Sequence, residues 1–277
     1  MAGARLEGKV IIVTGGTAGI GRRMVERFSD EGARVVFTGR RAARGAEVAK
    51  ATGATFITAD AGLEADAERT IKATAEAHGR IDGLINNAGA PGPTGRIETI
   101  ALDAYDRAMA VHVRGTLAHI KHVAPIMRAQ KSGAIVNLGS VAAHRANLSS
   151  SVVYSIAKAA VVHLARCAAM ELGEDGVRVN SISPGGIATG IFGKAMGLPP
   201  DEADKRIETV KTALAKHQAI PRAGLPDDIA NAALFLISDE GSFVNGEDIV
   251  IDGGLIWGRR YSEVTAGGHV WKSLFED

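Results

Sequence analysis

The feature that most constrains this chain is a glycine-rich turn that joins a short apolar strand to an amphipathic helix. Residues 9–14 are apolar and β-branched without polar alternation, which predicts a buried central strand of a parallel sheet. The loop of residues 15–21 follows, and then a helix over 22–31 with its apolar side chains at helical spacing. A strand at 34–38 completes a βαβ unit with a glycine-rich first turn.

The loop has the pattern Gly-x-x-x-Gly-x-Gly, formed by Gly15, Gly19 and Gly21. Glycines in such a turn let the backbone approach a pyrophosphate closely, and the helix N-terminus supplies free N–H groups and a positive dipole end. A tight turn without a ligand is the alternative. The buried strand before the loop and the helix after it favour a dinucleotide site.

The alternation of strands and helices continues to residue 254. Further strands are predicted at 54–60, 81–89, 133–140, 177–185 and 247–254, with helices at 64–78, 102–130 and 151–172. Residues 102–130 are expected to form one long helix or two, with Pro125 kinking or breaking it. Seven strands alternating with helices predict an α/β fold, a doubly wound parallel seven-stranded sheet with helices on both faces, the Rossmann-like arrangement.

No linker divides the sequence, so we expect a single domain over residues 1–277. Two segments depart from the alternation. One is a polar, lysine-rich helical insert at about 190–222, and the other is a C-terminal tail over 255–277. Long insertions at the carboxyl ends of strands often shape a substrate site, so the insert is expected to do so here.

Composition bears on the possible partners. The formal net charge is +1, from 32 basic and 31 acidic residues, so nothing indicates nucleic acid or a membrane surface as a partner. The single Cys167 precludes an intramolecular disulfide, and no apolar run reaches the roughly 20 residues that span a bilayer. No apolar signal-peptide core opens the sequence. We expect a cytoplasmic protein that acts on a small molecule. His119 and His122 lack evident carboxylate or thiol partners, so no metal site is predicted.

The end of the second predicted strand bears on the choice of cofactor. An acidic residue there would hold the adenosine ribose diol of NAD, but Gly39 occupies the position and Arg40 and Arg41 follow it. A 2′-phosphate would meet no repulsion and would pair with either arginine through charge-assisted hydrogen bonds. The sequence therefore favours NADP(H). NAD(H) is the alternative, with both arginines simply solvated.

Tyr154 and Lys158 lie on one face of the predicted helix at 151–172, about one turn apart. The ordinary pKa of a phenol is near 10, and a neighbouring ammonium lowers it, so the pair is a candidate acid and base. Any helix that carries both residue types can show this spacing. The meaning of the pair therefore depends on the rest of the chain.

Together these stretches resemble the short-chain dehydrogenase/reductase family, in its single-domain branch. The matching segments are residues 14–21, 86–89, 140, 154–158, 180–185 and 252–254, which run in the family's order. The resemblance implies that Tyr154 exchanges a proton with the substrate oxygen and that Ser140 hydrogen-bonds the same oxygen. It implies that Lys158 binds the nicotinamide ribose and lowers the pKa of the tyrosine.

The resemblance also implies which residues surround the cofactor. Asp60 is expected to cap the adenine pocket, Asn87 to lie beside the cofactor, and Ile187 and Thr189 to contact the nicotinamide carboxamide. The full expected set is Gly15, Thr17, Gly19, Ile20, Gly21, Arg40, Arg41, Asp60, Ala61, Asn87, Ala88, Gly89, Tyr154, Lys158, Pro184, Gly185, Ile187 and Thr189.

One position departs from the family pattern. The family usually has an asparagine in the helix after the fourth strand, which completes a proton relay with the lysine through water. His112 stands at that position here. A neutral imidazole also donates and accepts hydrogen bonds, so His112 is a candidate catalytic residue in a relay with a different pH response. A purely structural His112 is the other possibility.

The sequence favours hydride transfer between a nicotinamide cofactor and a secondary alcohol or ketone with a hydrophobic or cyclic body. Apolar residues of the insert and the segment between Ser140 and Tyr154 suggest an apolar pocket, or else ordinary packing under a lid. Ile191, Phe192, Met196, Leu198, His144 and Leu148 are the residues concerned. A dinucleotide-binding sensor or structural module without catalysis is the alternative function. Epimerisation or dehydration on a related fold is a third, for which this chain has little room.

The resemblance implies a homotetramer that forms through the last strand and the helices around 102–130 and 152–172. The tail carries Trp257, Trp271 and Phe275, more aromatic area than a free tail normally exposes to water. We expect the tail to pack on a neighbouring subunit.

Overall fold

The protein is described by a computed structural model that covers residues 4–266 and residue 275. Its centre is a parallel sheet of seven strands in the order β3-β2-β1-β4-β5-β6-β7. The strands are β1 (Val10–Val13), β2 (Arg34–Gly39), β3 (Thr55–Thr58), β4 (Gly83–Asn86), β5 (Gly133–Leu138), β6 (Val177–Pro184) and β7 (Asp248–Ile251). The strand order reverses between β1 and β4, and in open α/β sheets ligands bind at the carboxyl ends of the strands at such a point. The predicted doubly wound fold is confirmed.

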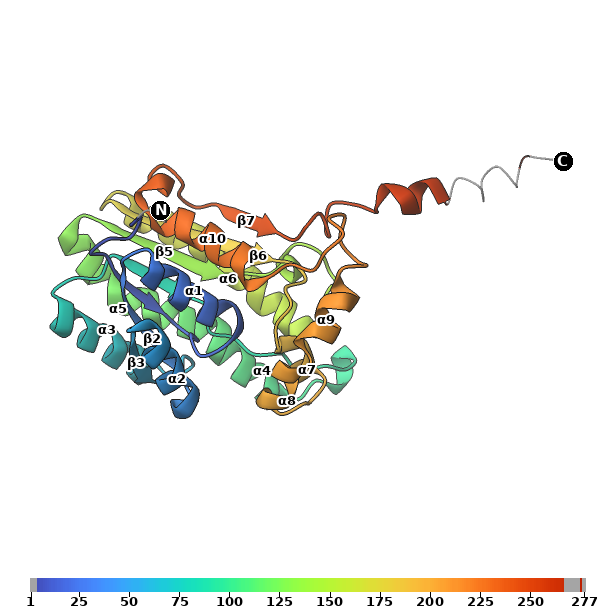
Figure 1. The fold of residues 1–277 in the computed structure, drawn as a ribbon, viewed down its shortest axis with the longest axis horizontal. Coiled ribbons are helices and arrows are strands. Elements are labelled where there is room, and N and C mark those ends of the chain that lie inside the picture. Colours follow the sequence, from blue (N-terminus) through green and yellow to red (C-terminus); the bar gives the residue numbers. More distant parts are fainter. Residues whose placement is uncertain (1–3, 267–274, 276–277) are drawn as a thin grey trace.

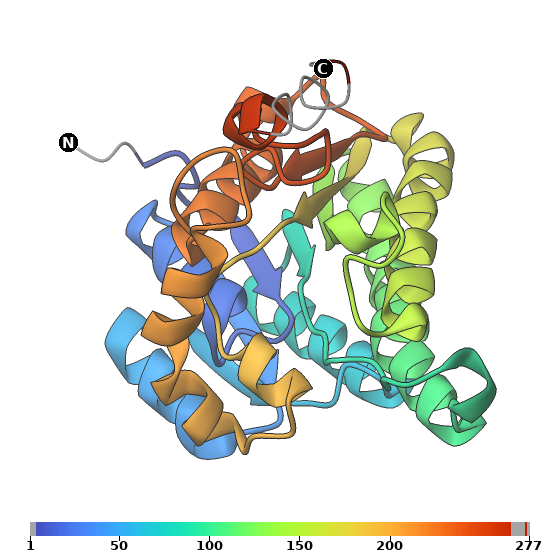
Figure 2. The same cartoon turned by 90° about the vertical axis from the view of Figure 1, so that its right-hand side faces the viewer.

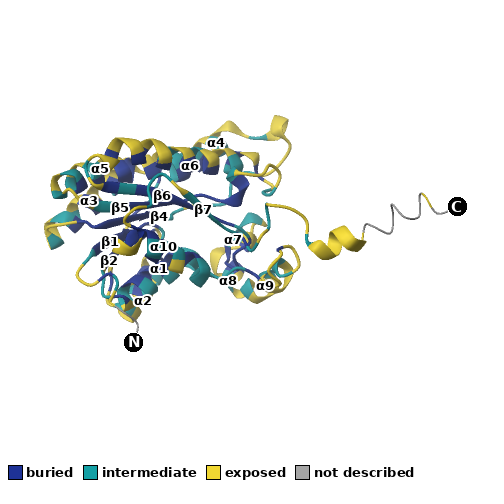
Figure 3. Ribbon diagram, turned by 90° about the horizontal axis from the view of Figure 1, so that it is seen from above, coloured by how far each residue is buried: buried dark blue, intermediate teal, exposed yellow. Residues whose placement is uncertain are grey.

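Helices cover both faces of the sheet (Figure 3). The helices on one face are α1 (Gly19–Asp30), α2 (Ala42–Thr52) and α10 (Pro226–Ile237), and those on the other are α3 (Glu64–His78), α5 (Gly115–Gln130) and α6 (Val152–Gly173). Each face has its own apolar core. In β1, Ile11 and Val13 point into the first core while Ile12 points into the second, as strand alternation requires.

Residues 102–130 do not break where the sequence predicted. Helix α4 (Leu102–Met109) runs into a π-helical turn, η2 (Ala110–Arg114), and α5 then continues to Gln130. Pro125 lies inside α5 without ending it, because a proline removes only one backbone donor, which the surrounding packing of α5 tolerates here. The interruption falls instead at His112, and such π-turns often mark functional sites.

The insert consists of three short helices, α7 (Ile191–Ala195), α8 (Pro200–Lys205) and α9 (Ile207–Leu214). They lie at the carboxyl end of the strands, on the side that Figure 2 turns toward the viewer. Short 3-10 turns complete the described elements at η1 (Ile97–Thr99), η3 (Val141–Ala143) and η4 (Asp239–Gly241).

Helix α6 is the one helix in the described part of the chain that is long and apolar enough to cross a bilayer by length and composition. The sequence analysis had found no such run. Val161, Ala165 and Leu172 of this helix are buried, and the last two belong to the core over one face of the sheet. Packing against the sheet accounts for the apolar composition of α6.

The segment after β7 projects from the body of the molecule (Figure 1). Trp257 is 77% exposed and Phe275 is 84% exposed. Trp271 lies outside the described residues. Within this chain, Trp257 and Phe275 therefore remain largely uncovered.

Candidate active site

The glycine loop is built to bring backbone close to a ligand and to the neighbouring strand end. Gly15 has a φ of +70° and Gly19 a φ of +54°, values that residues with a side chain rarely adopt. A Cβ on Gly21 would lie 2.3 Å from the carbonyl oxygen of Gly15. The loop thus has no space for side chains at Gly15 and Gly21, and α1 starts at Gly19 with the free N–H groups of a helix N-terminus.

The Asn87 side chain holds this loop in place. Its Nδ2 donates to the carbonyl oxygens of Thr14 and Gly15 at 2.9 and 3.2 Å. The Thr14 hydroxyl in turn accepts hydrogen bonds from the backbone N–H groups of Asn87 and Ala88, each at 3.0 Å. Sequence analysis placed Asn87 beside the cofactor and did not identify its support of the loop, nor any role for Thr14. The contacts of Asn87 and of Thr14 both arise because β1 and β4 are neighbours in the sheet, and the sequence alone does not reveal this pairing.

Ser140 and Tyr154 are positioned by two local caps. The Ser140 hydroxyl accepts from the backbone N–H of Ala142 at 3.2 Å at the start of η3. The Ser151 hydroxyl accepts from the backbone N–H of Tyr154 at 3.1 Å and so caps α6. Because both caps form at the carboxyl side of β5, the serine and the tyrosine face the same cleft.

Lys158 lies one turn further along α6 and is buried. Its Nζ donates to the carbonyl oxygen of Leu138 at 2.6 Å and lies 5.6 Å from the centre of the Tyr154 ring. Burial lowers the pKa of Lys158 to about 8. Burial also raises the pKa of Tyr154, and hydrogen bonding with the Ser140 side chain opposes that rise. The expectation of a lowered Tyr154 pKa is therefore wrong for this arrangement, since burial of the phenol raises the pKa.

His112 lies in the π-turn and is 2% exposed. Its Nε2 is 2.9 Å from the carbonyl oxygen of Ala90, and its ring meets Tyr154 edge to face. Among the described residues, the buried Nδ1 has no hydrogen-bond partner. Burial and the nearby Lys158 charge lower the pKa of His112 to about 3, so the imidazole is neutral near neutral pH. The position of Gly89 has no room for a side chain, because a Cβ there would lie 2.9 Å from Cε1 of the His112 imidazole.

The two arginines after β2 differ in their surroundings. Arg40 is mostly exposed and its Nη1 lies 3.8 Å from an oxygen of Asp60. The Nη1 of Arg41 lies 3.9 Å from Asp201 and 3.8 Å from Asp204, two carboxylates of α8. Gly39 is required here because a Cβ would lie 2.5 Å from the Thr17 methyl carbon. The insert is thus joined to the end of β2, a link that sequence analysis did not identify.

The segment after β6 closes over the glycine loop. Pro184 ends β6. Gly185 follows without a side chain because a Cβ there would lie only 2.5 Å from the Cβ of Asp252. Ile187 forms an isolated bridge with Gly224. Thr189 then reaches α1, since its Cγ2 lies 3.3 Å from where a Cβ on Gly19 would be. Thr189 and the glycine loop, both expected cofactor contacts, therefore lie side by side.

His144 and Asp248 form a partly exposed link between the segment after Ser140 and the last strand. His144 Nε2 is 2.6 Å from Asp248 Oδ2, and the hydroxyls of Ser181 and Ser183 donate to Asp248 Oδ1 at 2.6 and 3.0 Å. The Asp248 side chain is 3% exposed. The segment that follows Ser140 is thereby fastened to β6 and β7. Sequence analysis named His144 only as a residue near the pocket mouth.

A sequence model described as enoyl-(acyl carrier protein) reductase matches residues 15–256. A curated relative, short-chain dehydrogenase reductase 5 of Arabidopsis thaliana, is 38% identical over 92% of this chain and 96% of its own length. The chain belongs to the short-chain dehydrogenase/reductase family. The resemblance inferred from the motifs is thereby confirmed, and the chain is an oxidoreductase of a family that uses nicotinamide cofactors.

Two solved structures are similar to this member of the short-chain dehydrogenase/reductase family. One, titled levodione reductase, has a TM-score of 0.78 and 33% identity, over 90% of this chain and 97% of that one. Another, titled ribose-5-phosphate isomerase from Brucella melitensis 16M, has a TM-score of 0.84 and 30% identity, over 96% and 98% of the two chains. The two titles name different reactions on closely similar folds, so the fold alone does not decide the chemistry.

Proposed function

We propose that this chain interconverts a ketone and a secondary alcohol with NADP(H), using Ser140, Tyr154 and Lys158. The observation that carries the proposal is the burial of a protonated phenol beside a serine hydroxyl, with an ammonium behind it. A bound nicotinamide would supply or accept the hydride. Membership of the short-chain dehydrogenase/reductase family supports an oxidoreductase, and the likeness to a protein titled levodione reductase agrees with it.

The residues divide the proton chemistry between them. Because burial raises the pKa of Tyr154, its phenol keeps its proton and is a donor to the carbonyl oxygen of a ketone. Ser140 hydrogen-bonds the same oxygen and stabilises the charge that develops on it. Lys158, with a pKa of about 8, holds a proton that can replace the one Tyr154 gives up. In the direction of oxidation the proton moves the opposite way: Lys158 first releases a proton, Tyr154 passes its own to Lys158, and Tyr154 then accepts the proton of the alcohol.

His112 is the proposed continuation of this proton path. A neutral imidazole offers one donor and one acceptor nitrogen. The buried Nδ1 of His112 has no partner within residues 4–266, and the imidazole ring packs against Tyr154. A group with this placement suits a relay through water behind Lys158. Because the pKa of His112 is about 3, the imidazole takes part as a hydrogen-bonding bridge and does not become charged at neutral pH.

Preference for NADP(H) rests on the end of β2. No carboxylate occupies position 39 to hold a ribose diol, and Arg40 is largely solvent-exposed and free to turn. Arg41 is already near Asp201 and Asp204, so a 2′-phosphate would compete with those carboxylates for it. The pyrophosphate would lie against the glycine loop, whose tight path depends on Gly15 and Gly21 because side chains there would clash with Ala88 and with the loop itself.

A substrate with a hydrophobic or cyclic body is supported by the insert. Phe192, Met196 and Leu198 are 37%, 73% and 39% exposed, so apolar surface remains uncovered where the insert meets the carboxyl end of the sheet. Such surface at a cleft is typical of a ligand site.

A homotetramer is supported by a second set of exposed apolar residues. On α5 and α6, Leu117, Ile156 and Met170 are 50%, 48% and 68% exposed. These two helices are where the family resemblance placed an interface. The exposed Trp257 fits the hypothesis that the tail packs on a neighbouring subunit. Light scattering of the full chain and of a chain ending at Gly258 tests both points, and an unchanged mass and unchanged kinetics would reject the role of the tail.

The experiment that tests the function is a panel of ketones and secondary alcohols assayed with NADPH, NADP⁺, NADH and NAD⁺. We expect turnover with apolar ketones, a lower KM for NADPH than for NADH, and a loss of about 100-fold or more in kcat for Tyr154→Phe. Tyr154→Phe keeps the ring that packs against His112, so cofactor binding should persist. Full activity of Tyr154→Phe would refute the mechanism, and no turnover across the panel would favour a dinucleotide-binding module instead.

A further inference from the structure

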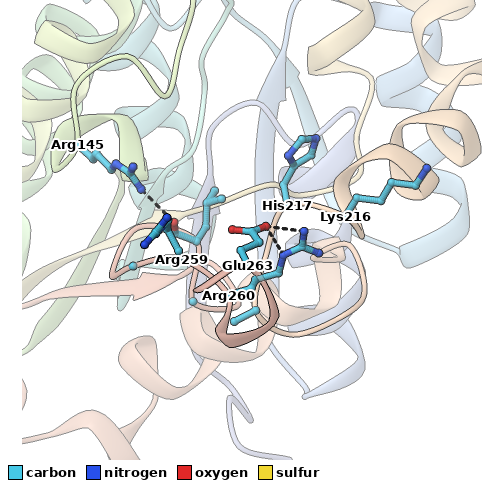
Figure 4. Close-up of a pocket in the computed structure, with 10 residues that line it drawn as sticks. Arg145, Lys216, His217, Arg259, Arg260 and Glu263 are labelled. Atoms are coloured by element: carbon cyan, nitrogen blue, oxygen red, sulfur yellow. Dashed lines mark hydrogen bonds and ion pairs between the residues drawn. The ribbon is translucent and has the colours of Figure 1, made fainter. Parts of the chain in front are cut away.

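A cavity of about 510 Å³ lies outside the catalytic cleft, between the segment after Ser140, the end of the insert and the start of the tail (Figure 4). Its charged lining is Arg145, Lys216, His217, Arg259, Arg260 and Glu263. Four of these are Lys or Arg and one is a carboxylate, so the lining has a net charge of +3 with His217 neutral. The whole chain has a net charge of only +1. Positive charge is therefore concentrated at this cavity.

The carboxylate of the lining is already engaged. Glu263 accepts from Arg260 Nε at 2.6 Å, as Figure 4 shows. Arg145 reaches the cavity from the opposite wall, and its guanidinium makes one hydrogen bond among the described residues, a long one of 3.4 Å to the carbonyl oxygen of Leu255. Within the described residues, Arg145, Lys216 and Arg259 form no ion pair. Like charges that converge in this way repel each other unless an anion lies between them.

We propose that this cavity binds a phosphate or carboxylate group. Guanidinium groups match the planar geometry of both anions through paired charge-assisted hydrogen bonds. The volume of about 510 Å³ is within the range of small-molecule sites. The bound group is either one end of a small molecule or a free anion, since the same arginine contacts recognise both.

The position of the cavity relates it to the reaction. Arg145 follows Ser140 by five residues, Lys216 follows the last helix of the insert, and Arg259 follows β7. These segments all leave the carboxyl edge of the sheet, where the catalytic residues lie. An anionic group held here would stand beside the catalytic cleft. The part of the inference that concerns a substrate rests on the proposed function, whereas the anion site itself does not.

Calorimetric titration with inorganic phosphate at constant ionic strength tests the site without any assay of activity. We expect saturable binding, weakened about tenfold by Arg145→Gln and by Arg259→Gln, each of which removes one charge-assisted contact. Arg34→Gln is the matched control, because Arg34 is exposed at the amino end of β2, away from this edge. Absence of saturable binding, or equal weakening by Arg34→Gln, would overturn the proposal.

A second measurement separates the two sources of the anion. The KM of a ketone with a distal carboxylate is compared with that of its methyl ester, in the wild type and in Arg145→Gln. A KM that rises about tenfold for the acid and not for the ester assigns the site to the substrate. A KM ratio that stays constant, with phosphate binding intact in the wild type, assigns it to a separate anion. If no ketone is turned over, the proposed function fails while the phosphate titration still decides the anion site.

Discussion

The imidazole of His112 meets the phenol ring of Tyr154 edge to face, with ring centroids 5.4 Å apart and an interplanar angle of 86°. Lys158 lies on the same tyrosine, 5.6 Å from its ring centre. The phenol is thus held between a neutral imidazole and a buried ammonium. Packing thus restricts the orientation of the Tyr154 ring.

Replacing His112 tests the relay. We expect His112→Ala to slow turnover by about tenfold or more and to change the shape of the pH–rate curve, because the buried bridge behind Tyr154 is lost. His119→Ala is the control. His119 is also 2% exposed and hydrogen-bonds the carbonyl oxygen of Gly115 at 2.7 Å, so it too costs stability when removed. A pH–rate curve that is the same for His112→Ala and the wild type would reject the relay.

Lys158 makes stability depend on pH. Burial lowers its pKa from 10.5 to about 8, so between these values the unfolded chain binds a proton that the folded chain does not. The contribution of Lys158 to the free energy of unfolding therefore increases as the pH rises from 8 to 10.5. Below pH 8 the buried charge lowers the stability of the folded chain. We expect Lys158→Met to be more stable than the wild type at pH 7, by about 1–2 kcal/mol after loss of the bond to Leu138.

Urea unfolding at several pH values measures this difference. The advantage of Lys158→Met should shrink between pH 8 and pH 10.5, while its catalytic activity is lost throughout. Lys72→Met, at a side chain 73% exposed, should show no such trend. A gap between Lys158→Met and the wild type that does not change with pH would contradict the lowered pKa.

The contact of Arg41 with the insert should control cofactor affinity. Asp204→Asn removes a carboxylate 3.8 Å from Arg41 Nη1. The 2′-phosphate of NADPH then has one competitor fewer for the Arg41 guanidinium. We expect the KM for NADPH to fall about threefold and the KM for NADH to stay the same. Glu202→Gln is the control on the same helix, since Glu202 pairs with Lys205. An equal effect on both cofactors would show that Arg41 does not recognise the 2′-phosphate.

The buried carboxylate of Asp248 should contribute strongly to stability. It accepts from Ser181 and Ser183 and lies 2.6 Å from His144 Nε2. Asp248→Asn places an amide donor where an acceptor is required, so we expect the free energy of unfolding to fall by about 1–3 kcal/mol. Asp239→Asn is the control, since that side chain is 86% exposed and should change stability by less than about 0.5 kcal/mol. Chemical denaturation that gives equal values for the two variants would contradict this role.

The sequence was sufficient for those parts of the fold that repeat a local pattern. Short stretches of sequence predict the strand–helix alternation, the glycine loop and the Tyr154–Lys158 spacing. The structure has these features at the predicted positions. The π-turn at Ala110–Arg114 was not predicted, because Pro125 is the stronger local signal for a break. Helices α2 and α10 were also not assigned individually, although the alternation requires helices there.

The site was predictable to a smaller extent, because much of it depends on contacts between distant segments. The Arg41–Asp204 pair joins β2 to the insert, and His144 meets Asp248 across 104 residues of sequence. The pKa of Tyr154 rises rather than falls because burial is decided by the tertiary structure. Spacing on a helix gives the neighbours of a side chain but not the amount of water around it.

The π-turn makes the length of one segment as important as its composition. A π-turn holds one residue more than an α-helical turn, so winding Ala110–Arg114 as regular α-helix would rotate everything after it by about 100° relative to α4. Ile120 and Val123, now in the core, would then turn away from the sheet. The extra residue of the π-turn thus determines which surface of α5 faces inward, whatever amino acids α5 itself carries.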